Sequence, residues 1–253
     1  MKKISFFLGS FICLMTLGCS KQETVQLESL KDGYFDIAQK TEVKPLKGTE
    51  LTEMLSNYDH KEMVDGNQKI YTFTTDNEEL MVSEPKDHEG ITDILYTKSQ
   101  SPDSLAIAHS LSSNGASSLV LNTVDMDKFK TITSKLSEES SNLYNAYLNL
   151  SEKMAEDHSL TLTEVQKSIN LELTLQEIAS DDNYYSFKEA DSGDLLGTYV
   201  TANSETVHQI VYQNNVMGLL HDTMMADNCI MFSVSTNETT LSNQKEVMSL
   251  FDK

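Results

Sequence analysis

The apolar stretch Ser118-Leu119-Val120-Leu121 is matched in the second half of the chain by Ile230-Met231-Phe232-Ser233. Each is a short, continuous apolar run, which predicts a buried strand. Five further pairs of short stretches repeat in the same order at a nearly constant offset. They are Leu51-Thr52-Glu53-Met54 with Leu162-Thr163-Glu164-Val165, Tyr71-Thr72-Phe73 with Tyr185-Ser186-Phe187, Leu80-Met81-Val82 with Leu195-Leu196-Gly197, Ile94-Leu95-Tyr96 with Ile210-Val211-Tyr212, and Ala106-Ile107-Ala108-His109 with Gly218-Leu219-Leu220-His221. A repeat of this length indicates duplicated domains, not a solenoid.

Each copy of the repeat predicts the same unit, with the element order α-β-β-β-α-β. The first three strands are expected at 69–75, 79–84 and 92–98 in one unit and at 184–188, 195–201 and 206–213 in the other. Apolar helices are expected at 101–112 and 216–226, each followed by the fourth strand. The predicted fold class is α+β, a tandem duplication in which each unit has a mainly antiparallel four-stranded sheet.

A long amphipathic helix is predicted between the units, at about 125–156. The apolar side chains that recur there every seven residues are Phe129, Leu136, Leu143 and Leu150. Such a stripe fits either a coiled-coil partner or the protein's own sheet, and we favour the sheet because amphipathic faces are usually core faces. A shorter helix is expected at 241–251. The predicted domains are therefore 49–157, which includes the long helix, and 158–253.

The stretch at 162–175 fits two interpretations. Apolar residues alternate from Ile169 to Leu175, which is typical of a strand, whereas the repeat and the spacing of Val165 and Ile169 favour a helix. We favour the helix.

Residues 1–18 predict a signal peptide. Lys2 and Lys3 supply positive charge, and the apolar run at 4–17 is too short to remain as a membrane-spanning helix. Gly18 then precedes Cys19, where a signal peptidase would cut and a lipid would be attached. The alternative is an ordinary secretory signal that is cut near Gly18 and leaves Cys19 as a thiol.

This leader resembles that of the bacterial lipoproteins, although Thr16 stands where such leaders usually carry Leu. The resemblance implies an acyl chain such as palmitate on Cys19 and a place in the cell envelope, with the membrane as a partner through the lipid anchor. Ser20 after Cys19 resembles the sorting signal for the outer membrane in organisms that have one. In other organisms we expect the protein on the outer face of the cell membrane. The polar segment 19–48 predicts a flexible tether with a reach of roughly 30 Å.

The composition excludes some partners. The formal net charge is −20, and all 19 basic residues are lysine. The lysines form no cluster, so nucleic acid is not expected as a partner. With Cys13 removed with the leader and Cys19 lipidated, Cys229 remains as one thiol in an apolar run, and we expect it to be buried.

The candidate site residues are two histidines at matching places in the repeat, His109 and His221, together with the neighbouring Asp222. Their matching places suggest a paired site at the interface of the two units. The alternative, which we favour, is that each histidine packs inside its own unit. The six histidines do not have the spacing of metal ligands, and no metal or cofactor is predicted.

Two functions follow from these observations. The favoured one is a membrane-anchored envelope lipoprotein that acts as a non-catalytic binding or accessory module for an envelope protein, peptide or glycan. The alternative is an envelope hydrolase whose site lies at the interface of the two units and uses His109 or His221 with a nearby carboxylate, which predicts that both histidines face one pocket. The common hydrolase and nucleotide-binding motifs are absent from the sequence, which lowers the prior for an enzyme without excluding one.

Overall fold

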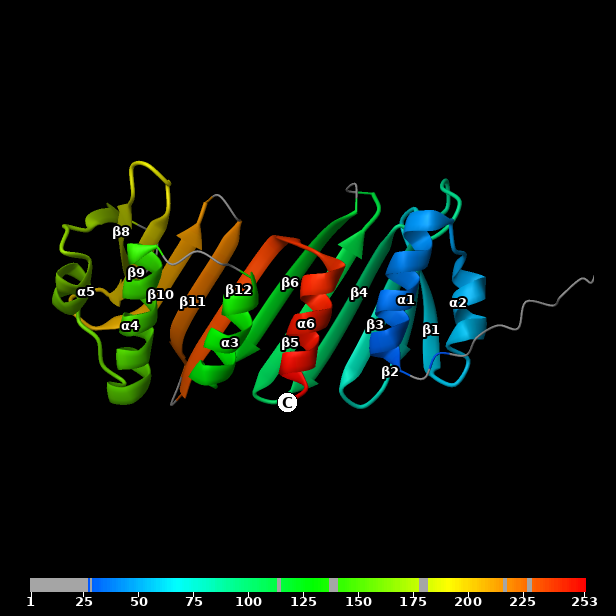
Figure 1. Ribbon diagram of the computed structural model, residues 1–253, viewed down its shortest axis with the longest axis horizontal. Coiled ribbons are helices and arrows are strands. Elements are labelled where there is room, and N and C mark those ends of the chain that lie inside the picture. The colour runs from blue at the N-terminus through cyan, green and yellow to red at the C-terminus, as the bar shows by residue number, and fades with distance from the viewer. Residues whose placement is uncertain are drawn as a thin grey trace, which may run out of the picture.

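The computed structural model describes residues 27, 29–112, 115–136, 141–177, 182–215, 218–226 and 229–253. Its centre is one antiparallel sheet of twelve strands in the order β1-β2-β3-β4-β5-β6-β12-β11-β10-β9-β8-β7. The six helices of these ranges all lie on one face of the sheet (Figure 1). The prediction of two units, each with its own four-stranded sheet, was therefore wrong.

The strands divide into two runs of six. The first run is β1 (Asp59–Asp65), β2 (Gln68–Thr74), β3 (Glu78–Pro85), β4 (Asp93–Gln100), β5 (Asp103–Ser110) and β6 (Ala116–Thr123). The second run is β7 (Thr174–Glu177), β8 (Asp182–Lys188), β9 (Leu195–Thr201), β10 (Val207–Asn214), β11 (Leu219–Ala226) and β12 (Cys229–Thr239). The helices are α1 (Leu30–Val43), α2 (Gly48–Met54), α3 (Met126–Leu136), α4 (Asn142–Asp157), α5 (Leu162–Ile169) and α6 (Leu241–Phe251).

The last strand of each run joins the two runs. β6 pairs with β12 in antiparallel register, with Leu121 opposite Val234. Both of these side chains are fully buried under the helices. The ranges 49–157 and 158–253 therefore share one hydrogen-bonded sheet and one apolar core, and the order of two helices, six strands and one helix occurs twice along the chain.

The helices predicted at 101–112 and 216–226 are strands, β5 and β11. In β5, Leu105, Ile107 and His109 are buried and the residues between them are half-buried, which is the two-residue period of a strand. The prediction failed because Ala106 and Ala108 occupy the other face, so the run looks apolar on every side. The other predicted strands correspond to β2, β3, β4, β6, β8, β9, β10 and β12, and the helix at 241–251 is α6.

The helix predicted at 125–156 is two helices, α3 and α4. Residues 137–140 lie outside the described ranges. A new helix begins after Ser141, whose hydroxyl oxygen accepts a hydrogen bond from the backbone N–H of Tyr144. The heptad side chains Phe129, Leu136, Leu143 and Leu150 are all buried, so the stripe packs on the protein's own core as favoured.

The stretch at 162–175 contains both of the structures that its pattern allowed. Helix α5 ends at Ile169, because Asn170 has a left-handed backbone conformation (φ 56°) that stops it. The chain then continues as β7, which pairs with β8. The choice of helix alone was wrong for Thr174 and Leu175.

The segment 19–48, predicted as a flexible tether, contains a folded helix. Its residues from Leu30 to Val43 form α1, which packs on β3 and β4. The reason is a helical spacing of apolar side chains, since Leu30, Tyr34, Ile37 and Ala38 are all fully buried. The predicted leader and Cys19 lie outside the described residues. Within the described residues no helix is long and apolar enough to cross a membrane.

Candidate functional site

His221, on β11, is enclosed by aromatic rings. Its ring centre lies 5.1 Å from that of Tyr144 and 5.9 Å from that of Tyr147, both on α4, and 5.7 Å from that of Tyr212 on β10. Phe129 of α3 completes the enclosure at 6.0 Å. The side chain is 1% exposed, and neither ring nitrogen has a hydrogen-bond partner among the described residues. Burial lowers the pKa of His221 to about 4, so the ring is neutral near pH 7.

His109, on β5, has different neighbours. Its Nδ1 lies 2.9 Å from the hydroxyl oxygen of Ser117 on β6, and its Nε2 lies 3.8 Å from a carboxylate oxygen of Glu42 on α1. The histidine is buried, whereas Glu42 is about half exposed. Burial lowers the pKa of His109, and the charge of Glu42 opposes this shift.

The structure does not bring the two histidines together. Strands β6 and β12 separate β5 from β11, so three steps of about 4.8 Å place the two strands roughly 14 Å apart. The neighbours given above for His109 and His221 have no residue in common. The hydrolase hypothesis needs both histidines at one pocket, and this arrangement gives it no support.

Asp222 follows His221 on β11 and therefore points to the opposite face of the sheet. One of its carboxylate oxygens accepts a hydrogen bond of 2.8 Å from the side-chain amide of Gln209, and the other is buried without a partner among the described residues. Burial raises the pKa of Asp222, and the bond from Gln209 opposes the shift. Cross-strand neighbours continue this polar row, because Ser233 donates to Asn122 (2.6 Å) and Asn122 donates to Ser104 (3.0 Å).

The face of the sheet that carries Asp222 is the one on which no described helix lies (Figure 1). We call it the open face, defined by a set of outward side chains of the six central strands, β4–β6 and β10–β12, that leaves out the strand ends and the irregular pairings at His208 and at 237–238. They are Asp93, Leu95, Thr97 and Ser99; Ser104, Ala106, Ala108 and Ser110; Ala116, Ser118, Val120 and Asn122; Gln209, Val211 and Gln213; Leu220, Asp222 and Met224; and Met231, Ser233 and Ser235. Only Asp93 and Asp222 in this set are charged.

The two-residue alternation of small polar and apolar residues is the sequence signal for this surface. It is visible in Ser104, Ala106, Ala108 and Ser110. Sequence reasoning missed it in β5 because that run was interpreted as a helix. Val120, Leu220 and Met224 are the most exposed large apolar side chains of the open face, at 42%, 40% and 38%.

On the helix-covered face, each run of strands carries a tyrosine that donates a hydrogen bond to a carboxylate. Tyr96 donates to Glu78 (2.8 Å), and Tyr212 donates to Asp194 (3.0 Å). Burial raises the pKa of Tyr96, and the bond to Glu78 adds to the shift. Both tyrosines therefore stay protonated near pH 7 and act as structural donors.

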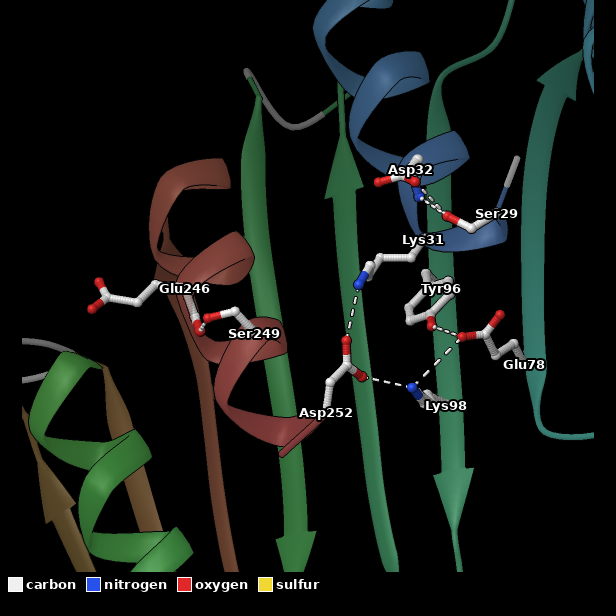
Figure 2. Close-up of polar contacts among 9 residues, drawn as sticks. All are labelled: Ser29, Lys31, Asp32, Glu78, Tyr96, Lys98, Glu246, Ser249 and Asp252. Atoms are coloured by element: carbon white, nitrogen blue, oxygen red, sulfur yellow. Dashed lines mark hydrogen bonds and ion pairs between the residues drawn. The ribbon is translucent and has the colours of Figure 1, made fainter. Parts of the chain in front are cut away.

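Around Tyr96 this arrangement extends into a network of charged residues (Figure 2). Asp252, at the end of α6, accepts hydrogen bonds from Lys98 of β4 (2.6 Å) and Lys31 of α1 (2.9 Å). Partial burial acts to raise the pKa of Asp252, but the bonds from Lys98 and Lys31 outweigh it and the pKa is lowered. Because each charge has an opposite neighbour, this network fastens α1 and the end of α6 to the sheet.

Other candidate residues give no site. Cys229, which we expected to be buried, is exposed, because it begins β12 at the edge of the core and the apolar residues after it alternate inward. A shallow depression of about 340 Å³ between α4 and α5 contains Lys153, which is ion-paired with Glu164. Within the described ranges, no group of three or more His, Cys, Asp or Glu side chains could hold a metal ion.

Comparisons with known proteins add no family. No protein-family model, curated protein or solved structure matches the chain significantly.

Proposed function

We propose that the chain is a non-catalytic binding module of the bacterial cell envelope, anchored through a lipid on Cys19, and that its open face binds an envelope protein, peptide or glycan. One observation carries this proposal. In a chain with a net charge of −20, the outward side chains that define the open face contain only two charges, Asp93 and Asp222, and the exposed Glu238 lies near the end of β12. Because the charge density of this face is low, a partner can bind without displacing counter-ions from it and without electrostatic repulsion.

The chemistry of the open face supports a polar, largely neutral partner. Hydroxyl and amide groups such as those of Ser104, Asn122 and Ser233 both donate and accept hydrogen bonds. Scattered apolar side chains such as Val120 and Leu220 add contact area, as in many non-obligate interfaces. No lysine lies in the set that defines the open face, which disfavours nucleic acid or an anionic lipid headgroup on it.

Site-specific photo-crosslinking in cells tests the proposal. A photo-reactive amino acid replaces Val120 on the open face of the full-length chain, and the matched control replaces Val43, an exposed valine at the end of α1. We expect a discrete adduct from position 120 and none from position 43. The crosslinked partner is then identified by mass spectrometry, or by glycan staining if it is not a protein.

The anchor is tested separately. In a Cys19→Ser variant we expect the chain to leave the membrane fraction and the adduct from position 120 to weaken. An adduct from position 43 alone, or none from several positions on the open face, would contradict this assignment of the binding surface. Retention of the Cys19→Ser chain in the membrane would contradict the anchor.

A further inference from the structure

Strand β1 leaves one edge of the sheet open. It lies at the end of the strand order and pairs with β2 over seven residues, from Asp59 opposite Thr74 to Asp65 opposite Gln68 (Figure 1). All seven of its residues are exposed, although the ring of His60 stacks on that of Phe73 in β2. The backbone N–H and C=O groups on its outer edge can therefore pair with another strand.

Two of the usual protections of an edge strand are missing in β1, although four of its seven residues are charged. It contains no proline, and its register with β2 has no bulge. It also exposes two large apolar side chains, Met63 (57%) and Val64 (59%). The strand at the other end, β7, has only four residues and offers a shorter edge. An exposed seven-residue edge with apolar side chains is a site for strand addition.

We infer that β1 is a self-association site, at which a second copy of the chain adds its own β1 in antiparallel orientation and continues the sheet across a two-fold axis. Opposed residues in an antiparallel pair point to the same face, so the two-fold axis must pass through a residue position. This inference depends on β1 alone and is independent of the proposed function of the open face.

Charge selects the position of the axis. An axis at Met63 places Met63 opposite itself, Lys61 opposite Asp65 of the second copy, and Asp65 opposite Lys61 of the second copy. Two opposite-charge cross-strand pairs then flank an apolar contact, which is a favourable arrangement. The remaining opposed residues within the strand are Glu62 and Val64.

The neighbouring registers are less favourable. An axis at Lys61 opposes two lysines, and an axis at Glu62 opposes two glutamates as well as Asp59 and Asp65. Like charges directly opposite each other destabilise a strand pair. An axis at Val64 moves Glu62 and Lys61 opposite Gly66 and Asn67 of the turn, so fewer strand residues pair. The register at Glu62 pairs the whole strand but opposes like charges, whereas the Met63 register still pairs residues 61–65 and opposes Lys61 to Asp65.

Charge reversal tests the interface in the full-length chain. Sedimentation equilibrium in detergent measures the dissociation constant of the dimer for wild type, Lys61→Asp, Asp65→Lys and the double variant. Each single variant turns two attractions into repulsions, and we expect its dissociation constant to rise at least about tenfold. The double variant restores both pairs with reversed charges, and we expect near wild-type affinity. Lys44→Asp, which changes the net charge equally but lies after α1, should have no effect.

Cysteine crosslinking tests the register. In membranes, Met63→Cys should form a disulfide-linked dimer on mild oxidation, because two such residues would lie directly opposite each other. Glu62→Cys is the matched control, since Glu62 would face Val64 of the second copy. A chain that stays monomeric at high micromolar concentration would overturn the inference, as would single charge variants that bind like wild type. Equal crosslinking at positions 62 and 63 would overturn the register.

Discussion

At the scale of single residues, His221 shows how burial without a partner makes a side chain sensitive to pH. Its two ring nitrogens lie among Tyr144, Tyr147, Tyr212 and Phe129, and the neighbouring Asp222 points to the other face of the sheet. A proton on this ring would have no carboxylate among these ring neighbours to offset it. The folded state therefore favours the neutral ring, in keeping with a pKa of about 4 against an ordinary value of about 6.5.

This shift predicts a loss of stability in acid. Well above pH 6.5 the ring is neutral in both states and the shift has no effect on stability. As the pH falls from 6.5 to 4, the unfolded chain binds a proton that the folded chain excludes, so the free energy of unfolding falls by about 3 kcal/mol. Urea unfolding of wild type and His221→Leu at pH 7 and pH 4 measures this difference, because the variant lacks the titrating group.

A control separates His221 from the other groups that titrate in this range. His88 is exposed, and His88→Gln should keep the pH dependence of wild type. If wild type and His221→Leu lose equal stability between pH 7 and pH 4, the buried neutral ring is not the cause.

Two glycines predict opposite effects of the same substitution. A Cβ at Gly48 would lie 2.0 Å from ring atoms of Tyr71, which is buried and donates a hydrogen bond to Glu84. Gly48→Ala should therefore displace the ring and reduce the free energy of unfolding by about 1–3 kcal/mol. At Gly33, inside α1, the nearest atoms would be 3.5 Å away, an ordinary contact. Gly33→Ala should be neutral or raise stability by up to about 1 kcal/mol. Urea unfolding of both variants checks the pair, and equal effects would contradict the packing at Gly48.

At the scale of elements, α1 is part of the folded core. Ile37 is fully buried on the face of α1 that packs on β3 and β4. Ile37→Ala should cost about 2–5 kcal/mol of stability, because it removes buried atoms and leaves a cavity. Gln39→Ala, on the exposed side of the same helix, should change stability by less than about 0.5 kcal/mol. If both variants unfold like wild type, residues 30–43 behave as the tether that their polar composition suggested.

The elements that the sequence predicted correctly share a clear period or clear turns. β3 alternates between buried and half-buried residues from Leu80 to Ser83, β9 follows the turn at Gly193, and α6 carries its apolar residues at helical spacing. Prediction failed where the outer face carries small or charged residues. Alanines on the open side of β5 hid its strand period, and β1 has no buried residue and so no apolar pattern at all.

The candidate site was less predictable than the strands. The repeat placed His109 and His221 on corresponding strands, β5 and β11, but not at equivalent positions. His221 lies opposite Tyr212, whereas Ile107, not His109, lies opposite Tyr96. Correspondence in sequence did not mean proximity, because the junction of β6 and β12 lies between them and could not be inferred from local patterns. Which distant strands pair depends on long-range packing, and short sequence patterns within one strand do not show it.

At the scale of the whole molecule, the junction of β6 and β12 makes the two runs of strands one structure. Leu121 and Val234 face each other across this junction and are fully buried by helices that come from both halves of the chain. α3 follows β6 but packs on β12 and on α6, while α6 follows β12 and packs on β5. Each run therefore buries its last strands under a helix from the other run, and separating the two runs would expose the core that they share.

This arrangement predicts a single cooperative unfolding transition. Leu121→Ala should reduce the free energy of unfolding by about 2–5 kcal/mol. Because the junction belongs to both runs, native-state hydrogen exchange should show that the most protected amides of β3 and β9 lose protection by the same amount. Two independent domains would lose protection in β3 alone, since Leu121 belongs to the first run by sequence. Equal loss in strands so far apart can arise only if the whole sheet opens as one unit.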